Sequence, residues 1–199
     1  CRLCVVEVSK PSWDGWFKVV TACLFPVEDG LIVRTNSDRV RLRKEVLELL
    51  LARSPRAEVV VELAREYGVF EPRHDADWEG DNCILCGICT RICQTHVTGA
   101  ISTVDRGVAK RVDTPFSEAS ADCVGCLACA RACPTGAIPF TEQGKDRTIW
   151  ARDFQLVPCT VCGAGTLTAE HAEWLCEKTN LPTEDLFVCD RCKVLRTAD

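Results

Sequence analysis

The alternation of hydrophobic and polar positions predicts short strands at the start of this chain. Residues 5–8 are a β-branched run, and residues 17–23 and 31–33 form two further short apolar runs. Gly15 and the Asp29-Gly30 pair lie between these runs and favour turns. The first 36 residues are therefore expected to form a small sheet.

Two helices are expected after the strands. Ser37 or Asp38 is a candidate cap for the first helix, and Ser54 with Pro55 is typical of the start of a second helix that stops near Gly68. The residues that repeat at helical spacing, and are expected to face the core, are Leu42, Val46, Leu49 and Leu50 in the first helix and Val59, Val60, Leu63, Ala64 and Tyr67 in the second.

The remaining pattern is mixed. Residues 69–82 are acidic and are predicted to form a linker that contains His74. Residues 101–112 alternate around Asp105-Arg106-Gly107, which predicts a hairpin. Residues 148–157 are predicted to form a strand, and residues 169–178 a helix capped by Thr168.

Composition narrows the possible classes of protein. The chain has 199 residues, a formal net charge of −5 and 16 cysteines. The acidic balance gives no support to a nucleic-acid-binding face, and no apolar run is long enough to cross a membrane. We expect a protein that is soluble, or that is peripheral to a membrane through its partners. The sequence begins at Cys1 and contains no methionine, so we expect it to start within a longer chain.

Eight of the cysteines form two C-x2-C-x2-C-x3-C runs, the second followed by Pro134. This spacing is typical of ferredoxins with two [4Fe–4S] clusters, in which the fourth cysteine of each run binds the other cluster. Disulfides are a poor alternative for this spacing. Thiolate-bound iron favours a reducing, cytoplasmic location. The predicted ligands of one cluster are Cys83, Cys86, Cys89 and Cys133, and those of the other are Cys93, Cys123, Cys126 and Cys129.

The cysteines at the two ends of the chain predict two more metal sites. Cys1, Cys4 and Cys23 lie among short strands and suggest a [2Fe–2S] cluster whose fourth ligand is upstream of residue 1. With only three ligands visible, a role outside a cluster stays open.

Near the C-terminus two C-x2-C knuckles flank the predicted helix, and they predict a structural zinc site. Zinc is preferred to a further Fe–S cluster, although ligand type alone does not separate the two. Cys176, on the helix between the knuckles, is expected to be a free thiol. The predicted zinc ligands are Cys159, Cys162, Cys189 and Cys192.

These motifs together resemble the NuoG/HoxU family, the iron–sulfur subunits of NADH dehydrogenase and NAD-linked hydrogenase complexes. The resemblance covers roughly residues 1–140 and is carried by Cys1-Arg-Leu-Cys4-Val-Val-Glu-Val, Ala22-Cys23-Leu-Phe-Pro26, Asn82-Cys83-Ile-Leu-Cys86, Asp105-Arg106-Gly107 and Cys133-Pro-Thr-Gly-Ala-Ile138. It implies a β-grasp [2Fe–2S] domain and a partner subunit, similar to NuoF, that binds flavin and NAD(P). The family usually has a histidine-plus-three-cysteine motif between its domains, and residues 53–74 contain no cysteine.

The expected fold class is therefore α+β, with four parts. These are a partial β-grasp domain (1–36), a helical linker (37–80), a two-cluster ferredoxin-like domain (81–140) and a zinc-ribbon-like domain (141–199). The missing motif favours a shorter complex of the hydrogenase, formate dehydrogenase or electron-bifurcating type.

No set of side chains suggests catalysis, and no G-x-G-x-x-G motif suggests dinucleotide binding. We therefore expect a subunit that relays single electrons between a flavin- and NAD(P)H-reactive subunit and a second redox subunit. One alternative is a metal- or redox-sensing binding protein. Another is a free-standing ferredoxin, which the additional domains disfavour.

Overall fold

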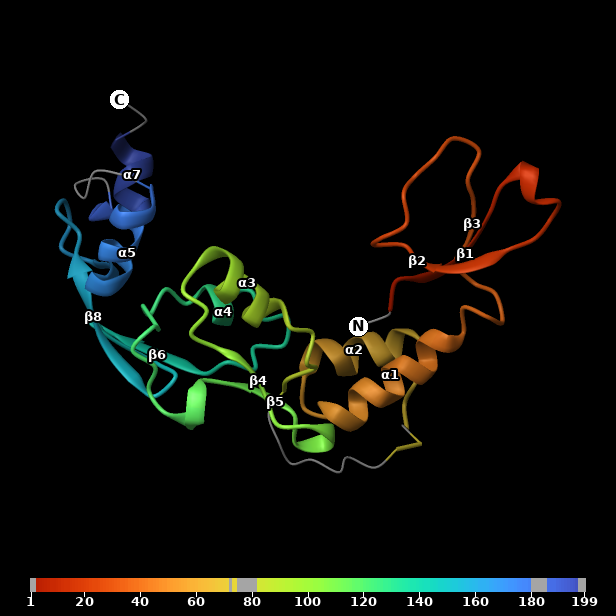
Figure 1. The fold of residues 1–199 in the computed structure, drawn as a ribbon, viewed down its shortest axis with the longest axis horizontal. Coiled ribbons are helices and arrows are strands. Elements are labelled where there is room, and N and C mark those ends of the chain that lie inside the picture. The colour runs from red at the N-terminus through yellow and green to blue at the C-terminus, as the bar shows by residue number, and fades with distance from the viewer. Residues whose placement is uncertain (1–2, 72, 75–81, 180–185, 197–199) are drawn as a thin grey trace. The chain divides into compact units, whose positions relative to one another are not determined.

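The computed structural model describes residues 3–71, 73–74, 82–179 and 186–196 (Figure 1). The chain divides into two compact units, residues 1–86 and residues 87–199, which we call the N-terminal and C-terminal units. Both contain helices and strands, as the α+β expectation requires. None of the helices in the described ranges is long and apolar enough to cross a membrane.

The N-terminal unit starts with a three-stranded antiparallel sheet of order β2-β1-β3 (Figure 1). Its strands are β1 (Val5–Ser9), β2 (Lys18–Thr21) and β3 (Ile32–Arg34), and a short 3-10 helix, Pro11–Trp13, follows β1. All five residues of β1 are buried, because β1 is the central strand. The three strands predicted from the β-branched and apolar runs are confirmed.

Two helices, α1 (Leu42–Arg53) and α2 (Glu58–Glu66), pack against each other after the sheet. Their shared core contains Leu47, Leu51 and Val60. The face predicted for α1 is wrong, because Leu42 and Leu49 are exposed. Leucines lie on several sides of this helix, so its period does not select one face, and packing against α2 buries the side that carries Leu47 and Leu51.

The predicted helix starts are also corrected. Helix α1 begins after Arg41, and Ser37 instead accepts a hydrogen bond from the Val40 N–H in a turn before the helix. The residue that precedes α2 is Ala57, whereas Ser54 ends α1 and is fully buried. The predicted stop at Gly68 is confirmed, since this glycine has a φ of +70° just past the helix end.

The C-terminal unit begins with the helix that carries Cys89 and Cys93, the last two cysteines of the first run. Helix α3 (Ile88–His96) packs against α4 (Ala128–Arg131). The chain segment that connects these two helices contains an antiparallel hairpin of β4 (Ser102–Val104) and β5 (Arg111–Asp113). The predicted hairpin is confirmed. Short 3-10 helices span Gly107–Ala109 and Pro115–Ser117.

A four-stranded antiparallel sheet follows, in the order β6-β7-β8-β9. Its strands are β6 (Phe140–Gln143), β7 (Asp146–Ile149), β8 (Arg152–Pro158) and β9 (Gly165–Thr168), and the last helices are α5 (Ala169–Thr179) and α7 (Asp190–Arg196). Thr168 accepts a hydrogen bond from the His171 N–H at 3.2 Å, so its predicted role as the cap of α5 is confirmed.

The single strand predicted over residues 148–157 is wrong, because the chain reverses within it. Ile149 pairs with Arg152, and the two residues between them, Trp150 and Ala151, have φ values of +53° and +55°. A two-residue turn of this kind normally contains asparagine or glycine. Tryptophan and alanine give no turn signal, so the sequence pattern did not reveal the hairpin.

Candidate metal centres

The two cysteine loops share one backbone conformation. In the first loop Leu85 and Gly87 have positive φ, and in the second Gly125 and Leu127 occupy the equivalent positions with φ values of +65° and +60°. Helices α3 and α4 each begin one residue after the second of these positions. Two left-handed residues bend each short spacer back on itself, which lets three cysteines of one turn face the same side.

The second loop forms one wall of an apolar cavity in the C-terminal unit. Four of the residues that line this cavity are Cys93, Cys123, Cys126 and Cys129, the same four that the spacing predicts as ligands of one cluster. The cavity has a volume of about 20 Å³. Ile101, Leu127 and Ile149 are among its apolar lining residues. The fold thus brings Cys93 of α3 to the three cysteines of the distant loop.

Burial controls the acidity of the thiols around this cavity. It raises the pKa of Cys123 and Cys126, and it raises the pKa of Cys129 to about 11. The neighbouring cysteines add to this effect, since thiolates repel one another. A thiolate in this cavity therefore needs a positive partner, and a cationic iron centre would supply one. The donor set fits a thiolate-bound cluster.

Two arginines of the sheet hold the second cysteine loop in place. Arg147 is buried, donates from Nη1 to the Gly125 carbonyl at 2.8 Å, and pairs with Glu142 at 2.9 Å. Arg152 donates to the carbonyl oxygens of Ser120, Ala121 and Cys123 at 3.1, 2.7 and 2.6 Å. Neither residue was predicted from the sequence, because nothing local marks an arginine that binds a loop elsewhere in the chain.

Cysteines predicted for the other cluster belong to both units. Cys83 and Cys86 end the N-terminal unit, whereas Cys89 and Cys133 lie in the C-terminal unit. The Cys83 sulfur accepts a hydrogen bond from the Leu85 N–H at 3.4 Å, and the Cys133 sulfur accepts one from the Ala137 N–H at 3.3 Å. Burial acts to raise the pKa of Cys133, but hydrogen bonds from Thr135 and nearby N–H groups lower it overall. The assignment of these four residues to one cluster stays a prediction.

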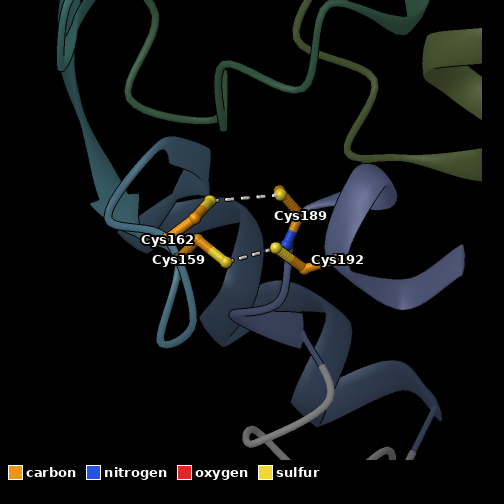
Figure 2. Close-up of side chains that lie close together, drawn as sticks. All are labelled: Cys159, Cys162, Cys189 and Cys192. Atoms are coloured by element: carbon orange, nitrogen blue, oxygen red, sulfur yellow. Dashed lines mark hydrogen bonds between the residues drawn. The ribbon is translucent and has the colours of Figure 1, made fainter. Parts of the chain in front are cut away.

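Near the C-terminus, the two knuckles come together in a compact site (Figure 2). The sulfur atoms of Cys159, Cys162, Cys189 and Cys192 all lie within 4.8 Å of one another, and the Cys162 and Cys189 sulfurs are 3.6 Å apart. The knuckles come from the turn after β8 and from the start of α7. Cys176 of α5 is partly buried and does not belong to this group.

Hydrogen bonds within this site separate the acidities of its thiols. The N–H groups of Cys189, Cys162 and Val161 lower the pKa of Cys159 to about 6. Hydrogen bonding to Cys189, together with burial, raises the pKa of Cys192 to about 12. Four sulfurs around a single zinc ion at about 2.3 Å would lie about 3.8 Å apart. The compact spacing fits one tetrahedral ion better than a cluster of several irons.

The N-terminal site is only partly within the described residues. The sulfur atoms of Cys4 and Cys23 are 3.2 Å apart, and hydrogen bonds from Cys23 lower the pKa of Cys4. Cys4 is half-buried and Cys23 is exposed. Cys1 lies outside the described residues, so the [2Fe–2S] ligand set stays a prediction.

Comparison with protein families places an iron–sulfur domain over the two cysteine runs. A family model described as a 4Fe-4S dicluster domain matches residues 82–137. The matched segment contains both predicted cluster-binding runs, in agreement with the cysteine spacing.

Two relatives and one solved structure define the type more closely. The chain is 34% identical to the NADP-reducing hydrogenase subunit HndD of Solidesulfovibrio fructosivorans, over 69% of this chain and 27% of the relative. It is 30% identical to the alpha subunit of the NADPH-Fe(3+) oxidoreductase of Geobacter sulfurreducens, over 86% of this chain and 23% of the relative. A chain of the NAD+-reducing [NiFe]-hydrogenase, solved in the H2-reduced state, aligns with a TM-score of 0.55 and 27% identity, over 69% of this chain and 67% of that chain.

The predicted relationship to NuoG/HoxU-type iron–sulfur subunits is confirmed by these matches. The chain spans about a quarter of the length of the curated relatives it matches.

Proposed function

We propose that this chain relays single electrons through a series of iron–sulfur clusters within an NAD(P)-linked oxidoreductase complex. The observation that carries the proposal is the apolar cavity lined by Cys93, Cys123, Cys126 and Cys129. Its four sulfurs come from two distant segments, as a two-cluster ferredoxin requires. When bound there, a [4Fe–4S] cluster would supply a one-electron carrier.

The second cluster of the pair would be held by Cys83, Cys86, Cys89 and Cys133. Support comes from the repeated loop conformation, since Leu85 and Gly87 adopt the same left-handed geometry as Gly125 and Leu127. Backbone N–H groups already point at the Cys83 and Cys133 sulfurs. Such hydrogen bonds stabilise thiolate ligands and set the cluster potential.

The sites at the two ends of the chain would have different roles. Cys1, Cys4, Cys23 and a further ligand from a preceding segment would hold a [2Fe–2S] cluster in a β-grasp domain. One zinc ion would be held by the four knuckle cysteines, Cys159, Cys162, Cys189 and Cys192. The support for this assignment is that their sulfur atoms all lie within 4.8 Å of one another. Zinc has no redox chemistry, so this site would stabilise the fold.

The partners proposed are a flavin- and NAD(P)-binding subunit similar to NuoF and a second redox subunit, such as a hydrogenase or formate dehydrogenase. The similarity to a subunit of an NADP-reducing hydrogenase supports a hydrogenase as the second redox subunit. A cytoplasmic location is proposed with it, because clusters with thiolate ligands assemble under reducing conditions.

Metal analysis of anaerobically prepared protein tests this proposal. We expect about ten irons, matching acid-labile sulfide and one zinc per chain, with EPR signals of two [4Fe–4S] clusters and one [2Fe–2S] cluster. About eight irons without a [2Fe–2S] signal would remove only the N-terminal assignment. Protein that holds no [4Fe–4S] cluster after reconstitution would overturn the main proposal.

Co-purification separates an electron-relay subunit from a free carrier. Purification of the native complex under anaerobic conditions is expected to yield this chain together with a flavoprotein. A chain that purifies alone, and exchanges electrons with many unrelated partners, would favour the free-standing ferredoxin instead.

A further inference from the structure

One of the residues that line the cavity is aromatic. Trp150 lies in the turn between β7 and β8, and it lines the same cavity as Cys93, Cys123, Cys126 and Cys129. It also packs against the core cluster that contains Leu127 and Phe154. The family model ends at residue 137, so Trp150 lies beyond the part of the chain that the model matches.

The indole N–H of Trp150 is buried without a matching acceptor. Within the part of the chain that the structure describes, Nε1 has no hydrogen-bond partner of good geometry. A buried donor without a partner is costly and uncommon in proteins. Trp150 lines the same cavity as Cys129 and packs against the core cluster that contains it, so a sulfur acceptor for the indole N–H lies nearby.

The backbone of the turn that carries this indole is strained. Trp150 and Ala151 both have positive φ, although neither is glycine or asparagine. Strain of this kind persists where the surrounding structure enforces it, and it is common at functional sites. A turn with Asn-Gly would connect β7 and β8 without strain, but it would not place a ring in the cavity.

The same hairpin also binds the second cysteine loop, whose cysteines line the cavity. Arg147 of β7 binds the Gly125 carbonyl, and Arg152 of β8 binds the Cys123 carbonyl. Both arginines also have acidic partners, Glu142 at 2.9 Å and Glu170 at 3.6 Å, so their charges are partly balanced. Their main effect here is to fix the cysteine loop relative to the Trp150 indole.

We infer that Trp150 is a positioning residue that sets the reduction potential of the cluster held by Cys93, Cys123, Cys126 and Cys129, by donating its indole N–H to the Cys129 sulfur. This inference rests on the proposed function, since it requires a cluster in the cavity. A hydrogen bond to a cluster sulfur stabilises the more negative, reduced form and so raises the potential.

The test compares Trp150→Phe with the native chain and with a matched control, Trp174→Phe. Phenylalanine keeps most of the aromatic volume but has no N–H. Trp174 lies on α5 and is not among the residues that line the cavity. Full-length protein is loaded with iron and sulfide anaerobically, and both [4Fe–4S] potentials are measured by EPR-monitored redox titration.

We expect Trp150→Phe to lower one of the two potentials by about 59 mV, which is a tenfold change in a one-electron equilibrium. The second potential should stay unchanged, and Trp174→Phe should change neither. Equal potentials in the native chain and in a fully loaded Trp150→Phe variant would overturn the inference. Iron and sulfide content, measured on the same samples, separates this result from failure of the proposed function, in which the native chain itself lacks a cluster.

A second measurement covers the case in which Trp150→Phe does not load. Native protein with ¹⁵N-labelled indole is examined by pulsed EPR for a nitrogen coupling to one reduced cluster. Among the described residues that line the cavity, Trp150 is the tryptophan, so a nitrogen coupling to the cluster would be assigned to its indole. Absence of the coupling in the loaded native chain would overturn the inference whatever the variant does.

Discussion

The C-terminal unit contains two thiolate sites that differ in how they hold their sulfurs. Around the cavity, Cys93 and the Cys123–Cys129 loop are spread over an apolar space, and the β7–β8 hairpin supports them from outside. In the knuckle site, four sulfurs lie within 4.8 Å and few other side chains take part. The first arrangement places its sulfurs on the wall of an apolar core, whereas the second gathers four sulfurs at a spacing that fits one ion.

The difference shows what each site requires from the protein. With the proposed zinc ion bound, the knuckles would form a local unit whose stability depends on that ion, as in structural zinc sites. The cavity belongs to a hydrophobic core with Phe154, Ile149 and Leu127, so its shape depends on packing. Substitutions at equivalent positions of the two sites should therefore have different effects.

The largest effect is expected from the loss of a knuckle ligand. Cys192→Ser removes a buried thiol from a site whose ion contributes about 10 kcal/mol or more in structural zinc domains. The variant should lose its zinc, and the amides of α5 and α7 should exchange faster, as measured by metal analysis and hydrogen exchange. The cavity cluster should keep its EPR signal.

Cys176→Ser is the matched control, because Cys176 lies on α5 outside the sulfur group. It should keep one zinc per chain. Retention of one zinc by Cys192→Ser as well would contradict the four-thiolate site.

The next largest effect is expected when one glycine of each site is replaced by alanine and the losses of unfolding free energy are compared. A Cβ at Gly125 would lie 2.9 Å from the ring of Phe154, which is 2% exposed, and the φ of this residue is +65°. A Cβ at Gly163 meets nothing within 4 Å at a φ of +76°. Gly125→Ala should therefore cost about 2–4 kcal/mol of unfolding free energy, from overpacking and left-handed strain together.

Gly163→Ala should cost only about 1 kcal/mol, because strain is its single penalty. Anaerobic denaturant unfolding of the loaded chains measures both values. Equal costs would show that the cavity wall can move as freely as the knuckle turn.

A smaller effect is expected from Arg147, which connects the sheet to the cysteine loop. Arg147→Leu removes the donor to the buried Gly125 carbonyl and leaves Glu142 without this partner. An unsatisfied buried carbonyl costs about 1–3 kcal/mol. The exposed Arg106→Leu is the control and should change the unfolding free energy little. A similar loss in both variants would mean that the Arg147 contact does not hold the loop.

The smallest effect has the opposite sign. Ala151→Gly relieves a φ of +55° at an exposed turn position and should stabilise the chain by about 1 kcal/mol. The same exchange at Ala52, within α1, should destabilise it by about 1 kcal/mol, since glycine is a poor helix former. Thermal unfolding of the two variants compares them directly. Destabilisation by Ala151→Gly would show that the turn is not strained.

The ligand pattern was accessible from the sequence because metal binding by short loops is a local property. Two residues between cysteines limit how far apart the sulfurs can lie, so the spacing indicates a cluster or an ion without a structure. The strands around Val5–Ser9 and the cap at Thr168 were equally local, and both are confirmed.

The tertiary structure decided the features that depend on contacts between distant segments. Leucines surround α1, and only packing against α2 selected Leu47 and Leu51 for the core. The turn at Trp150 and Ala151 has no sequence signal, because the cavity and the sheet impose its conformation. Arg147 and Arg152 act through carbonyls more than twenty residues away. The sequence thus determined which residues can bind metal, while the surroundings of those residues were set by long-range packing.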